Sequence, residues 1–178
     1  MILTEFIDRE QHKPLDKDDI IKMSFRNGLK HYYYNDIGKG TTLKQLLPSR
    51  NSGRLILFAK KGTEVGHFCL LFNNERSGLH FFDPYGFGLK KVIDLTGSDH
   101  RLQYIIRGKD IHINKHEFQK MKDSKAAINT CGRHCITRWN CANMKPNEYE
   151  SFLHHHSMNP DEIVTMLTCE QDLSKLKI

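Results

Sequence analysis

Two apolar segments joined by a short polar turn constrain the fold of this chain more than any other feature. Gly66–Phe72 is apolar on both faces, as is typical of a central strand. Leu79–Asp83 is a second strand-like segment, and it ends immediately before Pro84. The residues between the two segments, 73–78, are polar and glycine-containing, which is typical of a turn. The sequence therefore predicts an antiparallel β-hairpin.

The register of this hairpin decides whether two polar side chains can meet. If a three-residue loop places Asn73 opposite Ser77, His67 directly faces Asp83, with Cβ atoms about 4.5–5.5 Å apart. A slip by one residue would put Asp83 on the other face of the sheet. A histidine oriented by an aspartate is half of a nucleophilic triad, because the carboxylate fixes the tautomer and supports the imidazolium.

A cysteine at a predicted helix N-terminus supplies the missing nucleophile. The stretch from Asn129 to Trp139 begins with turn-forming residues, and Cys131, Cys135 and Trp139 recur near helical spacing. Either Asn129 or Thr130 can cap this helix. Cys131 then lies among unpaired backbone N–H groups at the positive end of the helix dipole, which favours the reactive thiolate. The alternative for a lone cysteine is a buried structural role, which we expect for Cys135.

The other segments predict a single α+β domain over residues 1–178, in which a central mixed or antiparallel β-sheet is flanked by helices. Pro14 interrupts the helical N-terminal region. Two further strands are expected at Arg54–Ala59 and Leu102–Ile106, and a polar connector is expected over 112–128. Helices are expected to begin at Asp16, at Thr41 or Thr42, and at Asn159. The last of these helices should run to about Leu176.

Composition limits the classes of function. The chain has 178 residues and no segment long enough to span a membrane, and residues 1–6 lack the pattern of a signal peptide. Its five cysteines, an odd number with irregular spacing, favour a reducing compartment over a disulfide framework. The net charge of +6 fits either a basic surface or loose, sequence-independent attraction to nucleic acid. With no long apolar helix face left over, we expect a monomer.

Three runs of sequence resemble a known family, the adenovirus-type maturation proteases, which share a clan with the SUMO-deconjugating proteases. The runs are Gly66-His67-Phe68, Phe81-Phe82-Asp83-Pro84-Tyr85-Gly86-Phe87 and Cys131-Gly132-Arg133-His134-Cys135. The resemblance covers about residues 54–142. It implies a thiol endopeptidase that matures capsid precursors, with His67 as general base, Asp83 as its orienting acid and Cys131 as nucleophile. It also implies a location in the virion and the host-cell cytoplasm.

The chain departs from the family pattern at two positions. The family's oxyanion glutamine lies a few residues before the cysteine, but residues 124–130 contain no Gln. Gln119, twelve residues upstream of Cys131, is the candidate for that role. The residue after the histidine is Phe68, where family members often have Trp, and we expect its ring to cover His67. The sequence requires no cofactor or metal. Activation by DNA or by a capsid-derived peptide, known for adenoviral enzymes, is compatible with the basic charge.

Alternatives to a maturation protease stay open. The chain could be a deconjugating protease for a ubiquitin-like modifier, an acetyltransferase of the kind that uses the same triad, or a non-catalytic capsid or nucleic-acid binding module. Cys69 shares a strand face with His67 and is a weak alternative nucleophile. The tract His154-His155-His156 is expected to be a solvated surface, because three consecutive residues cannot converge on one ion from a helix.

Overall fold

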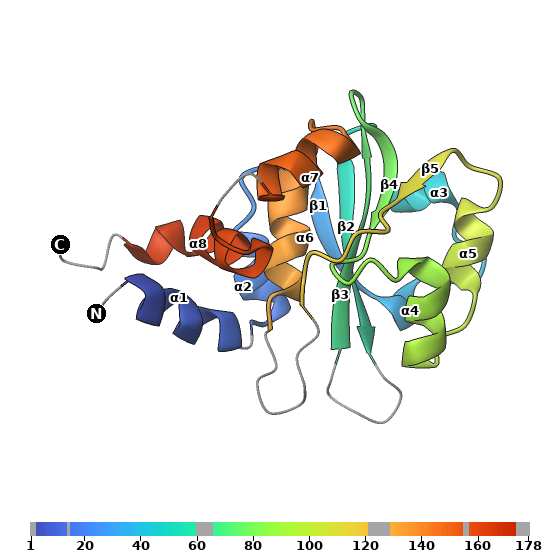
Figure 1. Ribbon diagram of the computed structural model, residues 1–178. Coiled ribbons are helices and arrows are strands. Elements are labelled where there is room, and N and C mark those ends of the chain that lie inside the picture. The colour runs from blue at the N-terminus through green and yellow to red at the C-terminus, as the bar shows by residue number, and fades with distance from the viewer. Residues whose placement is uncertain (1–2, 14, 60–65, 121–128, 155–156, 174–178) are drawn as a thin grey trace.

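A five-stranded mixed sheet lies at the centre of the fold, which the computed structural model describes for residues 3–13, 15–59, 66–120, 129–154 and 157–173 (Figure 1). The strand order follows the sequence, β1-β2-β3-β4-β5. The outer pairs, β1 with β2 and β4 with β5, are parallel, and the inner pairs are antiparallel. The strands are β1 (Leu29–Tyr33), β2 (Ser52–Ala59), β3 (Gly66–Asn74), β4 (Gly78–Phe82) and β5 (Ile111–Ile113).

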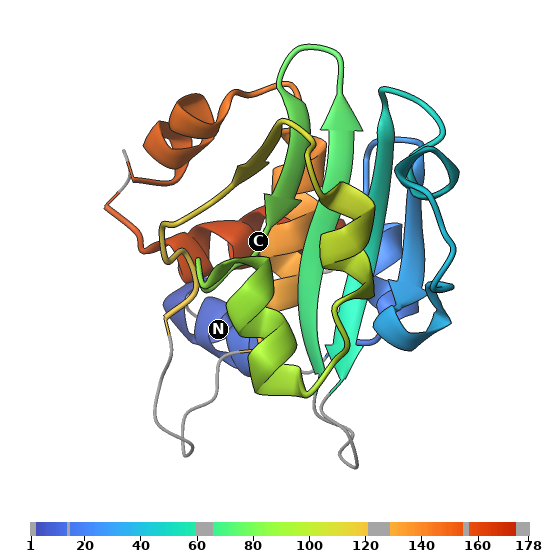
Figure 2. The same cartoon turned by 90° about the vertical axis from the view of Figure 1, so that its right-hand side faces the viewer.

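Helices cover both faces of this sheet (Figures 1 and 2). One face carries η1 (Tyr34–Asp36), α3 (Leu43–Leu46), α4 (Gly88–Thr96) and α5 (Arg101–Ile106). The other carries α2 (Lys17–Lys22), α6 (Cys131–Asn140), α7 (Pro146–His154) and α8 (Pro160–Leu173), with α1 (Leu3–His12) packed outside them against α8. The predicted α+β class, with a mixed sheet flanked by helices, is confirmed.

Helix α6 is buried on almost every side between the sheet and α8. All of its residues from Gly132 to Trp139 are buried, and the Cys135 thiol donates a hydrogen bond to the Phe68 carbonyl of β3 at 3.4 Å. Gly53 of β2 leaves room for the Trp139 ring, because a Cβ there would lie 2.9 Å from two ring carbons. This packing fixes the helix axis and so the position of its first residue. The predicted core location of Cys135 is confirmed.

The predicted helix starts follow from their caps. The Asp16 carboxylate accepts hydrogen bonds from the N–H groups of Asp18 and Asp19, and Thr42 and Gln45 form a reciprocal capping box. At α8, Asn159 and Glu162 cap each other in the same way. The end of that helix predicted near Leu176 lies outside the described residues.

The hairpin register differs from the prediction by two residues. Asn74 pairs with Gly78 and Leu70 with Phe82, so each paired residue of β3 lies opposite a residue two positions later than predicted, and the pairing ends at Phe82, before Asp83. The physical reason is an Asx turn. The Asn74 side chain accepts hydrogen bonds from the N–H groups of Arg76 and Ser77, which starts the three-residue loop one position later. An even shift keeps each side chain on its predicted face.

The predicted strand at Leu102–Ile106 is wrong, because this segment forms helix α5. Leu102 and Ile106 are buried four residues apart, and Tyr104 between them is exposed, which is the pattern of a helix rather than a strand. A five-residue apolar run is too short for periodicity to separate the two cases. Strands β1 and β5 and helices α4 and α7 were not predicted, and β5 overlaps the start of the expected polar connector.

Candidate active site

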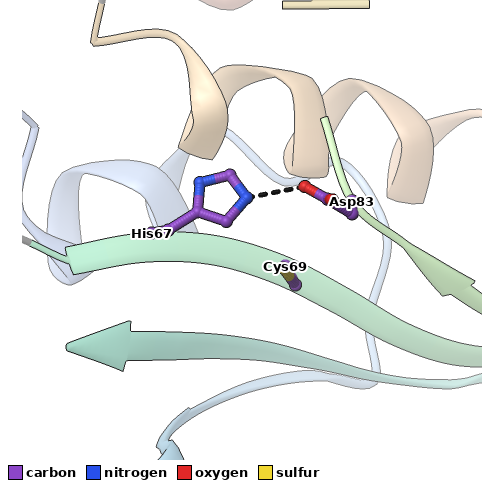
Figure 3. Close-up of side chains that lie close together, drawn as sticks. All are labelled: His67, Cys69 and Asp83. Atoms are coloured by element: carbon purple, nitrogen blue, oxygen red, sulfur yellow. Dashed lines mark hydrogen bonds and ion pairs between the residues drawn. The ribbon is translucent and has the colours of Figure 1, made fainter. Parts of the chain in front are cut away.

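His67 and Asp83 form a short, buried hydrogen-bonded pair. Nε2 of His67 lies 2.6 Å from Oδ1 of Asp83, and the Asp83 side chain has no solvent exposure (Figure 3). His67 is the second residue of β3, and Asp83 directly follows β4. The offset of two residues from the predicted register does not separate them, because the two side chains point toward each other (Figure 3).

A tight loop aims the Asp83 carboxylate at His67. The backbone N–H of Tyr85 donates to Oδ1 at 3.1 Å, and that of Phe87 donates to Oδ2 at 2.8 Å. The Asp83 backbone is held by the Asn114 side chain, which accepts from its N–H at 2.8 Å and donates to its carbonyl at 2.7 Å. These bonds occupy the carboxylate without neutralising it, so the aspartate is preorganised to hold one imidazole orientation. No sequence motif pointed to a role for Asn114.

Gly86 permits this loop. Its φ of +69° is a left-handed conformation, and a Cβ at this position would lie 2.5 Å from the His116 carbonyl oxygen. We expect Gly86→Ala to destabilise the protein by about 1–3 kcal/mol and to slow any reaction that depends on His67, since the loop orients Asp83. Thermal unfolding and alkylation of Cys131 would measure the two effects. Gly97→Ala is the control, because that glycine has a φ of +64° but open space around it. Equal effects of the two substitutions would contradict a role of the loop.

Cys131 occupies the first position of α6, as predicted, but the N-cap residue Thr130 makes no side-chain capping bond. The prediction that Asn129 or Thr130 provides the cap is wrong. The Asn129 side chain donates instead to the His12 carbonyl at 3.0 Å. The Thr130 hydroxyl donates to Asp161 at 2.5 Å. The Thr130 side chain therefore makes no bond to the N–H groups of the first turn of α6, and N–H groups at a helix N-terminus bind anions.

The surroundings of Cys131 and His67 favour their charged forms. Burial alone would raise the pKa of the Cys131 thiol, but the hydrogen bond and positive charge of His67, with the N–H groups of Phe68 and Gly132, lower it below 9.0. Burial opposes protonation of His67. The Asp83 carboxylate and the Cys131 sulfur outweigh that effect and hold its pKa well above 6.5. The arrangement favours a thiolate–imidazolium pair.

The aromatic ring that covers His67 is Tyr85 rather than Phe68. The Tyr85 and His67 rings stack with centroids 4.8 Å apart and planes 27° from parallel. The expectation that Phe68 covers His67 is wrong, because alternation along β3 sends Phe68 into the core on the α6 face. Tyr85 reaches the His67 ring from the loop that follows β4, where its backbone N–H donates to Asp83.

Cys69 completes a cluster that resembles a metal-ligand set. Its sulfur and the ligand atoms of His67 and Asp83 all lie within 4.8 Å of one another (Figure 3). Ligands of one tetrahedral zinc ion are roughly 3.3 Å apart, whereas the His67–Asp83 contact of 2.6 Å is a hydrogen bond. Burial raises the pKa of Cys69 to about 12, so this thiol stays protonated and is a poor nucleophile at neutral pH.

Gln119 is buried close to the His67–Asp83 pair. Its backbone N–H donates to the Pro84 carbonyl at 3.0 Å, and the Phe118 N–H donates to the same oxygen at 2.9 Å. Gln119, which is predicted for the oxyanion role, is therefore hydrogen-bonded through its backbone to Pro84, the residue after Asp83. The next residue, Lys120, donates its N–H to Asp161 at 3.1 Å. The structure thus brings Gln119 into the region of the predicted site.

A cleft opens beside Cys131. It has a volume of about 470 Å³, and Ile20, Leu57 and Phe68 give it an apolar lining. Gly132 lies on the wall shared with α2, where a Cβ would collide with Ile20. A larger hollow of about 590 Å³, between β4, β5 and α7, does not include Cys131. The cleft next to Cys131 can therefore receive a substrate side chain.

The histidine tract can be placed only in part. His154 ends α7, is exposed, and stacks on Phe118 with ring centroids 6.1 Å apart. This contact agrees with the expected surface location for that residue. His155 and His156 lie outside the described residues.

The comparisons with known proteins place a viral protein among the relatives of this chain. No protein-family model matches it. Uncharacterized protein V9 of Sputnik virophage is 28% identical over 169 residues, which cover 86% of this chain and 93% of that protein. Within the part of the chain that the structure describes, no helix has both the length and the apolar character needed to cross a bilayer.

Proposed function

We propose that this protein is a viral thiol endopeptidase whose nucleophile is Cys131. One observation carries the proposal: the buried Asp83 fastens His67 through a 2.6 Å hydrogen bond, and Cys131 lies close enough to that imidazole for His67 to lower the pKa of its thiol. The order His67, Asp83, Cys131 agrees with the resemblance to the adenovirus-type maturation proteases. The similarity to a virophage protein supports the viral part of this proposal.

Cys131, His67 and Asp83 have different tasks in this mechanism. The Cys131 sulfur attacks the carbonyl carbon of the scissile peptide bond, and the carbonyl becomes a tetrahedral oxyanion. The imidazolium of His67 gives its proton to the leaving amine, and the carbon–nitrogen bond breaks. Water, deprotonated by His67, then cleaves the thioester and regenerates the thiol. Asp83 holds the ring orientation throughout.

The oxyanion needs preorganised donors, and the chain offers two kinds. The uncapped N–H of Cys131 is one, and the side-chain amide of Gln119 is the other. Backbone bonds hold Gln119 next to the Asp83 loop. Donors fixed before the reaction stabilise the developing charge without reorganisation.

Gln119→Ala should therefore lower turnover by roughly a hundredfold or more with little change in KM, because one oxyanion donor is lost. Steady-state cleavage kinetics would measure this effect. Gln103→Ala, on α5 at the far face of the sheet, is the control and should leave both constants unchanged. A change under about threefold in the Gln119 variant would remove this residue from the site.

We infer that the substrates are capsid precursor proteins and that the enzyme acts as a monomer in the virion and the host-cell cytoplasm, away from membranes. The chemistry of the site needs no resident metal or cofactor. The net charge of +6 supports non-specific contact with nucleic acid, and DNA or a capsid-derived peptide could raise the activity.

The deciding experiment offers three kinds of substrate to the same purified protein, with and without DNA and capsid-derived peptides. Capsid precursors test the proposal, fusions ending in a ubiquitin-like modifier test deconjugation, and acetyl-CoA with acceptor peptides tests acetyl transfer. Cleavage of precursors that requires Cys131 supports a maturation protease. Unreactive Cys131 together with strongly salt-dependent nucleic-acid binding would instead establish a binding module.

A further inference from the structure

A buried carboxylate outside the triad connects the two segments that carry the oxyanion donors. Asp161, in the first turn of α8, is 1% exposed. Its Oδ2 accepts the backbone N–H of Lys120 at 3.1 Å. Its Oδ1 accepts the Thr130 hydroxyl at 2.5 Å and lies 3.0 Å from Nε2 of His134. Asp161 thus binds one residue beside Gln119 and two beside Cys131.

Each of these bonds acts on a neighbour of the site. Lys120 follows Gln119, so its bond to Asp161 and the bond from Gln119 to Pro84 hold the Gln119 backbone from both sides. Thr130 precedes Cys131, and His134 lies one helical turn beyond it. Thr130 and His134 are completely buried, where hydrogen bonds to a charged acceptor are strong and geometrically restrictive.

The bond to Thr130 has a second consequence. Threonine at an N-cap position normally accepts a hydrogen bond from the first turn of its helix. Here the hydroxyl donates to Asp161, and α6 has no side-chain cap. The Thr130 hydroxyl is therefore aimed at Asp161 and makes no bond to the N–H groups of the first turn. The pKa of Asp161 supports an anionic acceptor: burial raises it, but the His134, Thr130 and Lys120 interactions outweigh burial and lower it.

We propose that Asp161 is a positioning residue that assembles the oxyanion hole, because it holds the backbone beside Gln119 and the residue before Cys131 in one arrangement. This inference rests on the proposed function, since it assigns a task to Asp161 in the same acyl-transfer chemistry. It predicts a selective defect. Reactions that create an oxyanion at Cys131 should slow, and reactions that need only the thiolate should not.

Two small probes separate these reactions without knowledge of the peptide substrate. p-Nitrophenyl acetate acylates the thiolate through a tetrahedral oxyanion and releases p-nitrophenolate. Iodoacetamide alkylates the same sulfur by displacement of iodide and creates no oxyanion. Mass mapping of the Cys131 peptide gives both rates, with Cys131→Ala as the background for the other cysteines.

In Asp161→Ala we expect acylation of Cys131 to fall about tenfold to a hundredfold, in line with the effect of small misplacements in active sites, while alkylation changes less than about twofold. Val164→Ala is the matched control, because Val164 is also fully buried on α8 and its truncation leaves the Asp161 bonds intact. A purely structural role of Asp161 would lower both rates together, as a loss of folded protein does, and would overturn the proposal.

Thr130→Val keeps the test informative if Asp161→Ala fails to fold. It removes one of the three bonds at nearly constant volume, and we expect the same selective loss of acylation at a smaller size, roughly fivefold for one hydrogen bond. Unchanged acylation would contradict the proposal. Failure of the proposed function would give a different result. Cys131 of the unmodified protein would then react with both probes no faster than Cys131 of His67→Ala. Alternatively, the unmodified protein would react with both probes but cleave no peptide bond.

Discussion

Cys131→Ala should abolish peptide-bond cleavage completely while leaving the fold intact. No covalent intermediate can form without the sulfur, so turnover should drop to the background rate rather than by a partial factor. Folding should persist because Cys131 is only partly buried, unlike the core cysteines Cys69 and Cys135, and because alanine favours a helix. Cleavage assays and thermal unfolding, performed on the same preparation, measure the two quantities.

The matched control for this experiment is Cys69→Ala. Cys69 lies within 4.8 Å of the His67 and Asp83 ligand atoms, but burial raises the pKa of its thiol to about 12. Its loss should leave a cavity and lower stability, while thiol labelling of Cys131 persists. Cleavage that survived in Cys131→Ala and vanished in Cys69→Ala would transfer the nucleophile role to Cys69 and disprove the proposed assignment.

The local part of the site could be predicted from the sequence because it depends on short-range signals. The apolar runs around His67 and before Asp83 predict a hairpin, and parity alone places both side chains on one face. The exact register depends on an Asx turn at Asn74, and alternatives two residues apart have the same apolar pattern. The hairpin was therefore predicted correctly, and its register was not.

The parts that the sequence did not reveal are contacts between distant segments. Asn114 holds the Asp83 backbone from 31 positions away, and Asp161 binds Thr130 across the same separation. Neither residue belongs to a recognisable motif. Asp161 follows Pro160 in the first turn of α8, where an acidic residue is common for local reasons alone. The cap expected from Thr130 is wrong because the backbone at this residue is helical, with φ −100° and ψ −1°, rather than extended as at most N-caps, while its hydroxyl donates to Asp161.

His67→Ala should lower cleavage by a factor on the order of 10⁴ and should also change how Cys131 labelling depends on pH. In the unmodified protein His67 helps to lower the Cys131 pKa below 9.0, against the opposing effect of burial. Without the imidazole, burial acts with little opposition, so the pKa of the thiol rises. The rise of labelling rate with pH should therefore move to higher pH in the variant, and labelling between pH 6 and 8 should become slow.

The pH profile of cleavage by the unmodified protein follows from the same pair. Cleavage needs the thiolate, so the rate should rise as pH increases through the lowered pKa of Cys131. It also needs a protonated His67, so the rate should fall as pH increases through a pKa held well above 6.5. Because the two groups titrate together, both limbs belong to the pair. Identical labelling profiles for the unmodified protein and His67→Ala would show that the imidazole does not activate Cys131. The geometry of the His67–Asp83 bond would then serve structure rather than catalysis.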